Sequence, residues 1–117
     1  MARAQTIIFA SPVYWYSMSA QMKVFFDRLT DLTVPPLKPL GKSLAGKTAF
    51  AIATGAAPEA PESFTRPFAD TAAYFNMNWG GLFYQRGADA LSAETIAAAR
   101  AFAQRIASAD AKGALCV

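Results

Sequence analysis

The residues best suited to ligand chemistry form a short, proline-stiffened loop that carries three neighbouring aromatic rings, those of Tyr14, Trp15 and Tyr16. Aromatic faces can stack on a flat conjugated ring, and free backbone N–H groups of the same loop can hydrogen-bond its edge. The rings could equally be core or interface aromatics, because interfaces are also enriched in Tyr and Trp. Residue chemistry alone gives these two interpretations similar weight.

A predicted strand and a predicted helix flank this loop. The strand, residues 6–10, is a continuous apolar run typical of a parallel sheet that is covered on both faces. Ser11 and Pro12 end it, since proline has no N–H to donate to a ladder. The helix begins after Ser17 or Ser19, either of which could cap it. Its apolar residues recur at helical spacing, and they are Met18, Met22, Phe25, Phe26 and Leu29. The loop is therefore expected at the carboxyl end of a strand, where ligands bind in open α/β sheets.

The rest of the chain alternates strands with helices. Strands are predicted over residues 48–53 and 79–84, and residues 30–47 read as a long extended connection. One helix is expected to start near Ser63 or Thr65 with Pro67 in its first turn, and another to run from Ser92 to about residue 109, followed by a frayed tail. Alternating strands and helices predict right-handed βαβ units in a parallel sheet.

Each predicted helix has an apolar face. In the middle helix this face is Phe64, Phe68, Ala72 and Phe75, and in the last helix it is Ile96, Ala99, Phe102, Ala103 and Ile106. Asn76 can end the middle helix in the left-handed conformation, and Gly80 and Gly81 would allow close packing of the last strand.

The segment SPVYWYSMSAQMKVFFDRL, residues 11–29, resembles the flavin-contacting segment of the NAD(P)H-dependent FMN reductases, a flavodoxin-like family that includes the iron-sulfur flavoproteins. Residues 46–47, 54–55, 79–84 and 86–89 are similar to the family as well. The length predicts a single domain over residues 1–117. The resemblance implies a flavodoxin-like parallel α/β sheet with helices on both faces, truncated at its N-terminal side.

What the resemblance implies about the site is a flavin ring held between two loops. One wall would be Ser11, Pro12, Val13, Tyr14, Trp15, Tyr16 and Ser17, and the other Thr54, Gly55 and Ala56. Flavin would carry the redox chemistry, so no catalytic side chain is expected. The implied cofactor is FMN, the reductant NAD(P)H, and the acceptor a quinone, a flavin or a similar small molecule.

The similarity covers only the second part of the family's domain, three βα units. Members normally have a further strand, a Ser/Thr/Arg-rich phosphate loop and another strand before the segment that here starts at Thr6. A flavin phosphate is usually cradled by backbone N–H groups at a helix N-terminus, so FMN is expected to bind weakly or not at all without that loop. Two alternatives stay open. One is a non-catalytic chain without bound flavin, either a truncated oligomerisation module or an incomplete gene product, and the other is a longer, active natural protein whose start lies upstream.

Composition narrows the remaining classes. The sequence is 54% hydrophobic and 16% charged, which fits a chain whose apolar surface is covered by a partner, and an unpaired edge at residues 7–9 predicts a homo-oligomer, most simply a dimer. The net charge of +3 is scattered, which disfavours nucleic-acid binding. Cys116 is the one cysteine and histidine is absent, so no metal site is expected. No apolar run is long enough for a membrane span and no signal peptide is evident, so a cytoplasmic location is expected.

Overall fold

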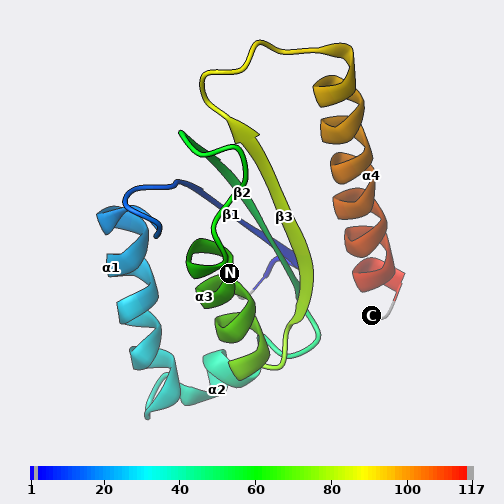
Figure 1. The fold of residues 1–117 in the computed structure, drawn as a ribbon. Helices are drawn as coiled ribbons and strands as arrows, with labels where there is room; N and C mark the ends of the chain where they lie inside the picture. The colour runs from blue at the N-terminus through cyan, green and yellow to red at the C-terminus, as the bar shows by residue number, and fades with distance from the viewer. Residues whose placement is uncertain (2, 116–117) are drawn as a thin grey trace.

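A three-stranded parallel sheet forms the centre of the computed structural model, which describes residues 1 and 3–115 (Figure 1). The strands lie in the order β1-β2-β3, and β1 and β2 pair from Thr6 with Thr48 to Pro12 with Thr54. The bounds are β1 Thr6–Pro12, α1 Ala20–Arg28, the 3₁₀ helix η1 Leu29–Thr33, α2 Lys38–Lys42, β2 Thr48–Gly55, α3 Glu62–Tyr74, β3 Asn78–Arg86 and α4 Ala93–Leu115. The predicted α/β class and parallel sheet are confirmed.

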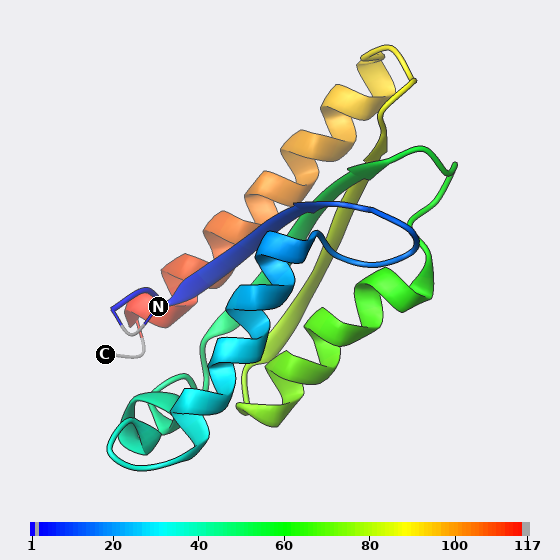
Figure 2. The same ribbon diagram turned by 90° about the vertical axis from the view of Figure 1, so that its left-hand side faces the viewer.

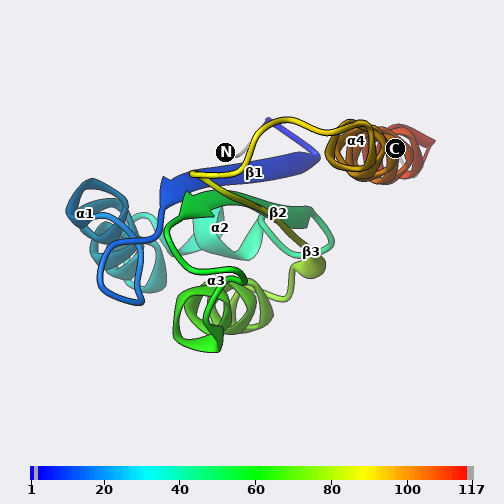
Figure 3. The same ribbon diagram turned by 45° about the horizontal axis from the view of Figure 1, so that its top comes forward.

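Helices cover the two faces of the sheet unequally. Figure 3 shows α1 and α3 on one face and α4 on the other. The first face holds most of the core, a cluster of aromatic rings in which Phe9 lies 5.1 Å from Phe26 and 5.8 Å from Phe68, between ring centroids. Phe64 and Phe68 are 0% and 1% exposed, so the predicted apolar face of the middle helix is the centre of the core.

Close packing on the other face depends on Gly80. A Cβ atom at Gly80 would lie 2.3 Å from the ring of Phe50, which is itself buried and stacks edge-on against Phe102 at 5.5 Å. β3 can therefore approach this ring only because residue 80 has no side chain, as the Gly80–Gly81 pair predicts.

Two predictions about the middle of the chain are wrong. Residues 30–47 are not an extended connection, because they contain η1 and α2, and Gly41 packs so closely on η1 that an added Cβ would lie 2.3 Å from the Leu32 oxygen. Pro67 lies inside α3 rather than in its first turn, because the helix already begins at Glu62, with Pro61 as its N-cap. Proline at the sixth helical position leaves one carbonyl without its usual N–H partner.

Three helix ends follow the predicted caps, and one differs. Ser19 is the N-cap of α1, accepting a hydrogen bond from the Met22 N–H at 3.2 Å, and Ser92 accepts from the Thr95 N–H at 3.1 Å. Asn76 has a φ of 58°, the predicted left-handed end of α3. The predicted end of the last helix near residue 109 is wrong, because α4 continues to Leu115, and residues 116–117 of the predicted tail lie outside the described residues.

The buried stripe predicted for the last helix is mostly wrong. Phe102 is buried and Ile106 half-buried, whereas Ile96 is 44% exposed and Ala99 and Ala103 are exposed. The reason is that α4 contacts each of the three strands but leaves part of this face of the sheet uncovered. In the described part of the chain, no strand lies beside the outer edge of β1, and Ile8 and Ile52 are 45% and 38% exposed on that open face.

The three loops that follow the strands gather at one end of the sheet (Figure 1). Figure 2 shows the loop after β1 reaching across toward the start of α3. Within the described residues, no helix combines the length and the apolar character that crossing a membrane requires.

Candidate functional site

The aromatic loop is a tight two-residue hairpin. The N–H of Tyr14 donates to the Ser17 oxygen at 2.9 Å, and the N–H of Ser17 donates back to the Tyr14 oxygen at 3.1 Å. The two residues between them, Trp15 and Tyr16, have φ values of 47° and 69°. Positive φ at both central positions is the conformation of a type I′ turn, which normally takes Asn-Gly.

Bulky aromatic residues are costly in this conformation. A non-glycine residue held at positive φ costs about 1–3 kcal/mol and persists only where its surroundings impose it. Here Ser63 at the start of α3 donates its hydroxyl to the Tyr16 oxygen at 2.6 Å, and the Val13 N–H donates to the Thr54 oxygen at 2.8 Å. The turn is thus held from both α3 and β2, and strain of this kind is concentrated at functional sites.

The strained turn presents its rings to solvent. Trp15 is 92% exposed, and Tyr14 and Tyr16 are 60% and 65% exposed. The interpretation of these rings as core aromatics is therefore wrong for the described chain. Their exposure leaves room for either a flat ligand or a partner surface.

Most backbone donors of the loop are already used, in contrast to the several free groups that the sequence suggests. Val13, Tyr14 and Ser17 donate within the chain, and Pro12 has no N–H. Among the described residues, the N–H groups of Trp15 and Tyr16 are those of the turn that have no acceptor. The backbone N–H groups of the turn that can still donate a hydrogen bond to a ligand are therefore those of Trp15 and Tyr16.

The beginning of the loop has a structural role. Ser11 is buried, and its hydroxyl accepts from the Ser19 N–H at 3.0 Å and donates to the Pro12 oxygen at 2.9 Å. This network fixes the end of β1 to the start of α1. A direct contact of Ser11, Pro12, Val13 or Ser17 with flavin stays a prediction.

The predicted second wall follows β2 and lies beside the turn. Thr54 and Ala56 are exposed, and Gly55 is half-buried. A Cβ atom at Gly55 would lie 3.0 Å from both the Val13 Cβ and the Tyr84 hydroxyl oxygen, so the two loops meet closely at this glycine. The structure thus brings the two predicted walls together, while their contact with a ligand stays a prediction.

Three residues that the sequence analysis did not assign to the site hold these walls in place. Besides Ser63, they are Tyr84, whose hydroxyl donates to the Ala57 oxygen at 2.6 Å, and Arg86, whose Nε donates to the Ala56 oxygen at 3.0 Å. Tyr84 and Arg86 alternate along the end of β3, and a polar side chain at the carboxyl end of a third parallel strand is the signal that could have identified them.

The cation of α3 is engaged by its own helix. Hydrogen bonding and charge from Asp70, and then from Glu62, raise the pKa of the exposed Arg66 guanidinium. Arg66 lies 3.2 Å from Asp70 and 3.3 Å from Glu62. Its charge is therefore matched by two carboxylates of its own helix, whereas Arg86 forms a longer ion pair, of 3.9 Å, with Asp89.

A curated relative matches part of the chain. The putative NAD(P)H-dependent FMN-containing oxidoreductase YwqN of Bacillus subtilis (strain 168) is 38% identical over 50 residues, which are 42% of this chain and 28% of YwqN. The match thus spans less than a third of that relative.

Solved structures share the fold over most of this chain. The Trp repressor binding protein of Bacillus subtilis superposes with a TM-score of 0.69 at 22% identity, over 89% of this chain and 62% of that one. General stress protein 14 of Treponema denticola, in complex with FMN, gives 0.56 at 22% identity, over 91% of this chain and 65% of that one. The chain covers less than two thirds of the length of either.

The family comparison covers nearly the whole chain. The model of the flavodoxin-like fold family matches residues 1–109, which include all three strands and most of α4. The chain belongs to the flavodoxin-like fold family.

Proposed function

We propose that this chain is part of an FMN-dependent NAD(P)H oxidoreductase that reduces a quinone, a flavin or a similar acceptor. The observation that carries the proposal is the strained turn, in which Trp15 and Tyr16 both have positive φ. This turn exposes both rings beside the Thr54–Ala56 loop. Backbone strain of this kind is concentrated at ligand-binding and catalytic sites. The names of YwqN and the FMN complex of general stress protein 14 support flavin as the ligand.

The residues of the turn suit a flat, conjugated ring. Its aromatic side chains offer stacking surfaces, and the unused N–H groups of Trp15 and Tyr16 can donate to oxygen and nitrogen atoms along a ring edge. Thr54, Gly55 and Ala56 would line the other side, fixed there by Tyr84 and Arg86. FMN, when bound, supplies hydride and electron transfer, whereas the protein orients the ring and leaves one side open for reductant and acceptor in turn.

The direct test is a titration of the purified chain with FMN and, in parallel, riboflavin, followed by flavin absorbance and fluorescence. We expect weak but saturable binding of both flavins with similar affinity, because the ring site lacks the phosphate loop. We expect Trp15→Ala to weaken this binding by about 10-fold or more, because stacking on one aromatic side chain is worth roughly 1–3 kcal/mol. NAD(P)H oxidation by the flavin-loaded chain is then measured.

Tyr74→Ala is the matched control for this titration. Tyr74 is 68% exposed, similar to Tyr16, but lies at the far end of α3, so its removal should leave flavin affinity unchanged. Absence of binding of either flavin to the wild-type chain, or equal losses in the two variants, would contradict the proposed site.

A second candidate function is assembly through β1 without catalysis. The observation that favours it is the open edge of β1 together with the exposed apolar side chains of Ile8 and Ile52 on the adjoining face. An unpaired edge with apolar neighbours is a template for pairing with another strand. The predicted homo-oligomer would bury this surface.

Assembly is tested by replacing an apolar residue of this surface with a charged one. We expect the wild-type chain to be a dimer or larger by size-exclusion chromatography with light scattering, and Ile8→Lys to be a monomer, because a buried, unpaired ammonium is costly. Val24→Lys on α1, where Val24 is 62% exposed, is the control and should keep the wild-type mass. A wild-type chain that is monomeric at every concentration would exclude this role.

A further inference from the structure

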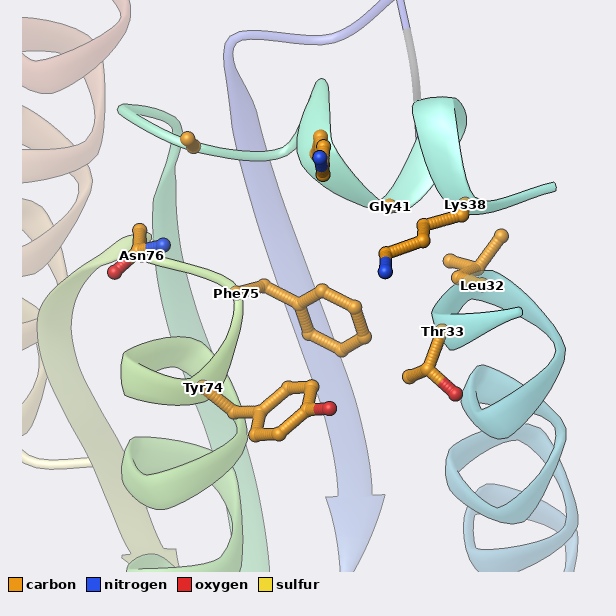
Figure 4. A pocket seen from close by; sticks show the side chains of 9 residues that line it. Leu32, Thr33, Lys38, Gly41, Tyr74, Phe75 and Asn76 are labelled. Atoms are coloured by element: carbon orange, nitrogen blue, oxygen red, sulfur yellow. The ribbon is translucent and has the colours of Figure 1, made fainter. Parts of the chain in front are cut away.

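A second concave surface lies at the end of the sheet opposite the aromatic turn. This basal cleft, about 480 Å³ in volume, is bounded by η1, by α2 with the turn after it, and by the end of α3 (Figure 4). The residues lining it are Leu32, Thr33, Lys38, Gly41, Lys42, Ala45, Tyr74, Phe75 and Asn76. Its size falls in the range of pockets for small organic ligands, and none of these residues belongs to the site described above.

The walls of the basal cleft are fixed by close backbone packing. Gly41 of α2 touches η1 so tightly that a Cβ would lie 2.3 Å from the Leu32 oxygen. The Gly46 N–H donates to the Asn76 oxygen at 3.0 Å, which joins the segment after α2 to the end of α3. Phe75, only 9% exposed, provides an apolar floor. The cleft is therefore a built feature of the fold rather than a gap between loose loops.

The charge of the basal cleft is positive. Of the lysines whose side chains are described, Lys23 pairs with Asp27 and Lys47 bonds the Ala4 oxygen, whereas Lys38 and Lys42 have no carboxylate partner. No Asp or Glu is among the described residues that line the cleft. In Figure 4 the Lys38 side chain extends from α2 toward the ring of Phe75. Asp70, in an adjoining hollow of about 420 Å³, is held by Arg66 at 3.2 Å.

Helix ends account for only part of this positive charge. The α-helix α3 ends at the cleft, and the C-terminus of an α-helix carries roughly half a negative charge. The end of α3 therefore offsets only a part of the charge of the two lysines. The remaining charge is available to an anion.

The aromatic and polar side chains beside the lysines indicate which chemical groups a ligand would have besides its negative charge. The ring of Tyr74 is 68% exposed and, together with Phe75, offers an apolar surface to a flat group. Figure 4 shows the Tyr74 hydroxyl directed across the cleft toward η1, where Thr33 lies. Ring and cation together match a molecule with an aromatic portion and an anionic group.

We propose that the basal cleft binds a small aromatic anion, an aryl carboxylate or a compound of the same chemistry, with the acidic group at Lys38 and Lys42 and the ring against Tyr74 and Phe75. This site is separate from the flavin proposal in residues and in place. β2, which runs from the level of the cleft to the aromatic turn, has eight residues, so the two sites are about 25 Å apart at a rise of about 3.3 Å per residue.

The test uses 1-naphthoate as the probe and the neutral 1-naphthalenemethanol as its comparison, with binding followed by ¹H–¹⁵N NMR of the full chain. We expect 1-naphthoate to shift the amide signals of Gly41, Ala45 and Asn76 saturably, and the neutral compound to bind at least 10-fold more weakly. The double variant Lys38→Gln with Lys42→Gln should lose at least 10-fold in naphthoate affinity, because it removes both charged hydrogen-bond donors of the cleft. Tyr74→Ala should lose about 5-fold, because it removes the exposed ring.

A matched control removes charge without touching the cleft. Lys23→Gln, on the exposed side of α1, lowers the net charge by one, as each single lysine substitution in the cleft does. It should change naphthoate affinity by no more than about 2-fold, because exposed charges contribute little. Equal affinity of the double variant and the wild-type chain, or shifts confined to the aromatic turn, would overturn the proposal. FMN binding of the double variant is measured beside it and should be unchanged, so failure of the flavin site and failure of this cleft give different results.

Discussion

Phe64→Ala is expected to lower the free energy of unfolding by about 3–5 kcal/mol, the cost of deleting a fully buried aromatic side chain. Phe64 is 0% exposed, and its ring centroid lies 5.1 Å from that of Phe68, which contacts Phe9 and Phe26 in turn. Small domains are stable by only about 5–15 kcal/mol, so this loss would remove a large share of the total. Urea unfolding followed by circular dichroism measures it as a lower midpoint.

Phe25→Ala is the matched control for Phe64→Ala. Phe25 belongs to the same aromatic cluster, 6.1 Å from Phe9, but is 41% exposed, so much of its surface already contacts water. Its removal should cost about 1–2 kcal/mol, in proportion to the apolar area that is buried. If the two variants lost the same free energy of unfolding, the buried ring of Phe64 on α3 would not be more important to the core than the half-exposed ring of Phe25 on α1.

Replacing the two central residues of the turn, Trp15→Asn together with Tyr16→Gly, is expected to move stability and flavin binding in opposite directions. Asn-Gly adopts positive φ readily, so the free energy of unfolding should rise by about 1–3 kcal/mol as strain is relieved. The same change removes both exposed rings, and FMN affinity should fall by about 100-fold, or about 2.7 kcal/mol. Urea unfolding and the FMN titration are carried out on the same preparation.

Tyr74→Asn provides the comparison for this turn variant. Tyr74 is as exposed as Tyr16 but lies in regular helix at the end of α3, so the substitution relieves no strain. Stability should not rise, and FMN affinity should not change. If the turn variant were less stable than the wild-type chain, the positive φ values of Trp15 and Tyr16 would not be a source of strain.

Periodicity of apolar residues identifies most of the fold, because burial follows secondary structure directly. The runs at residues 6–10, 48–53 and 79–84 became β1, β2 and β3, and the spacing of Phe64, Phe68, Ala72 and Phe75 gave the core face of α3. The burial predicted for the apolar face of α4 was wrong. The helical spacing of that face is correct, but the sheet beneath it has only three strands in the described chain. A sequence pattern shows which face is apolar, not how much surface is present to cover it.

The candidate site was predictable in place but not in detail. The aromatic loop and the Thr54–Ala56 loop meet as expected, because the carboxyl ends of parallel strands lie at one edge of the sheet. The positive φ of Trp15 and Tyr16 was not predictable, because sequence preferences argue against bulky residues there. The hydrogen bond from Ser63 to Tyr16 joins residues 47 positions apart, and local sequence carries no signal for such a contact.

The order of the strands along the chain is also their order in space, which bears on how the sheet assembles. Thr6 pairs with Thr48, which pairs in turn with Asn78, so the two loops to be closed span 42 and 30 positions. Closing the longer loop costs only about 0.3 kcal/mol more in chain entropy. The two pairings therefore have nearly equal closure costs, and among the described strands none has to be inserted between two others. Because β2 takes part in both pairings, the sheet is complete only when β2 is aligned with each of its neighbours.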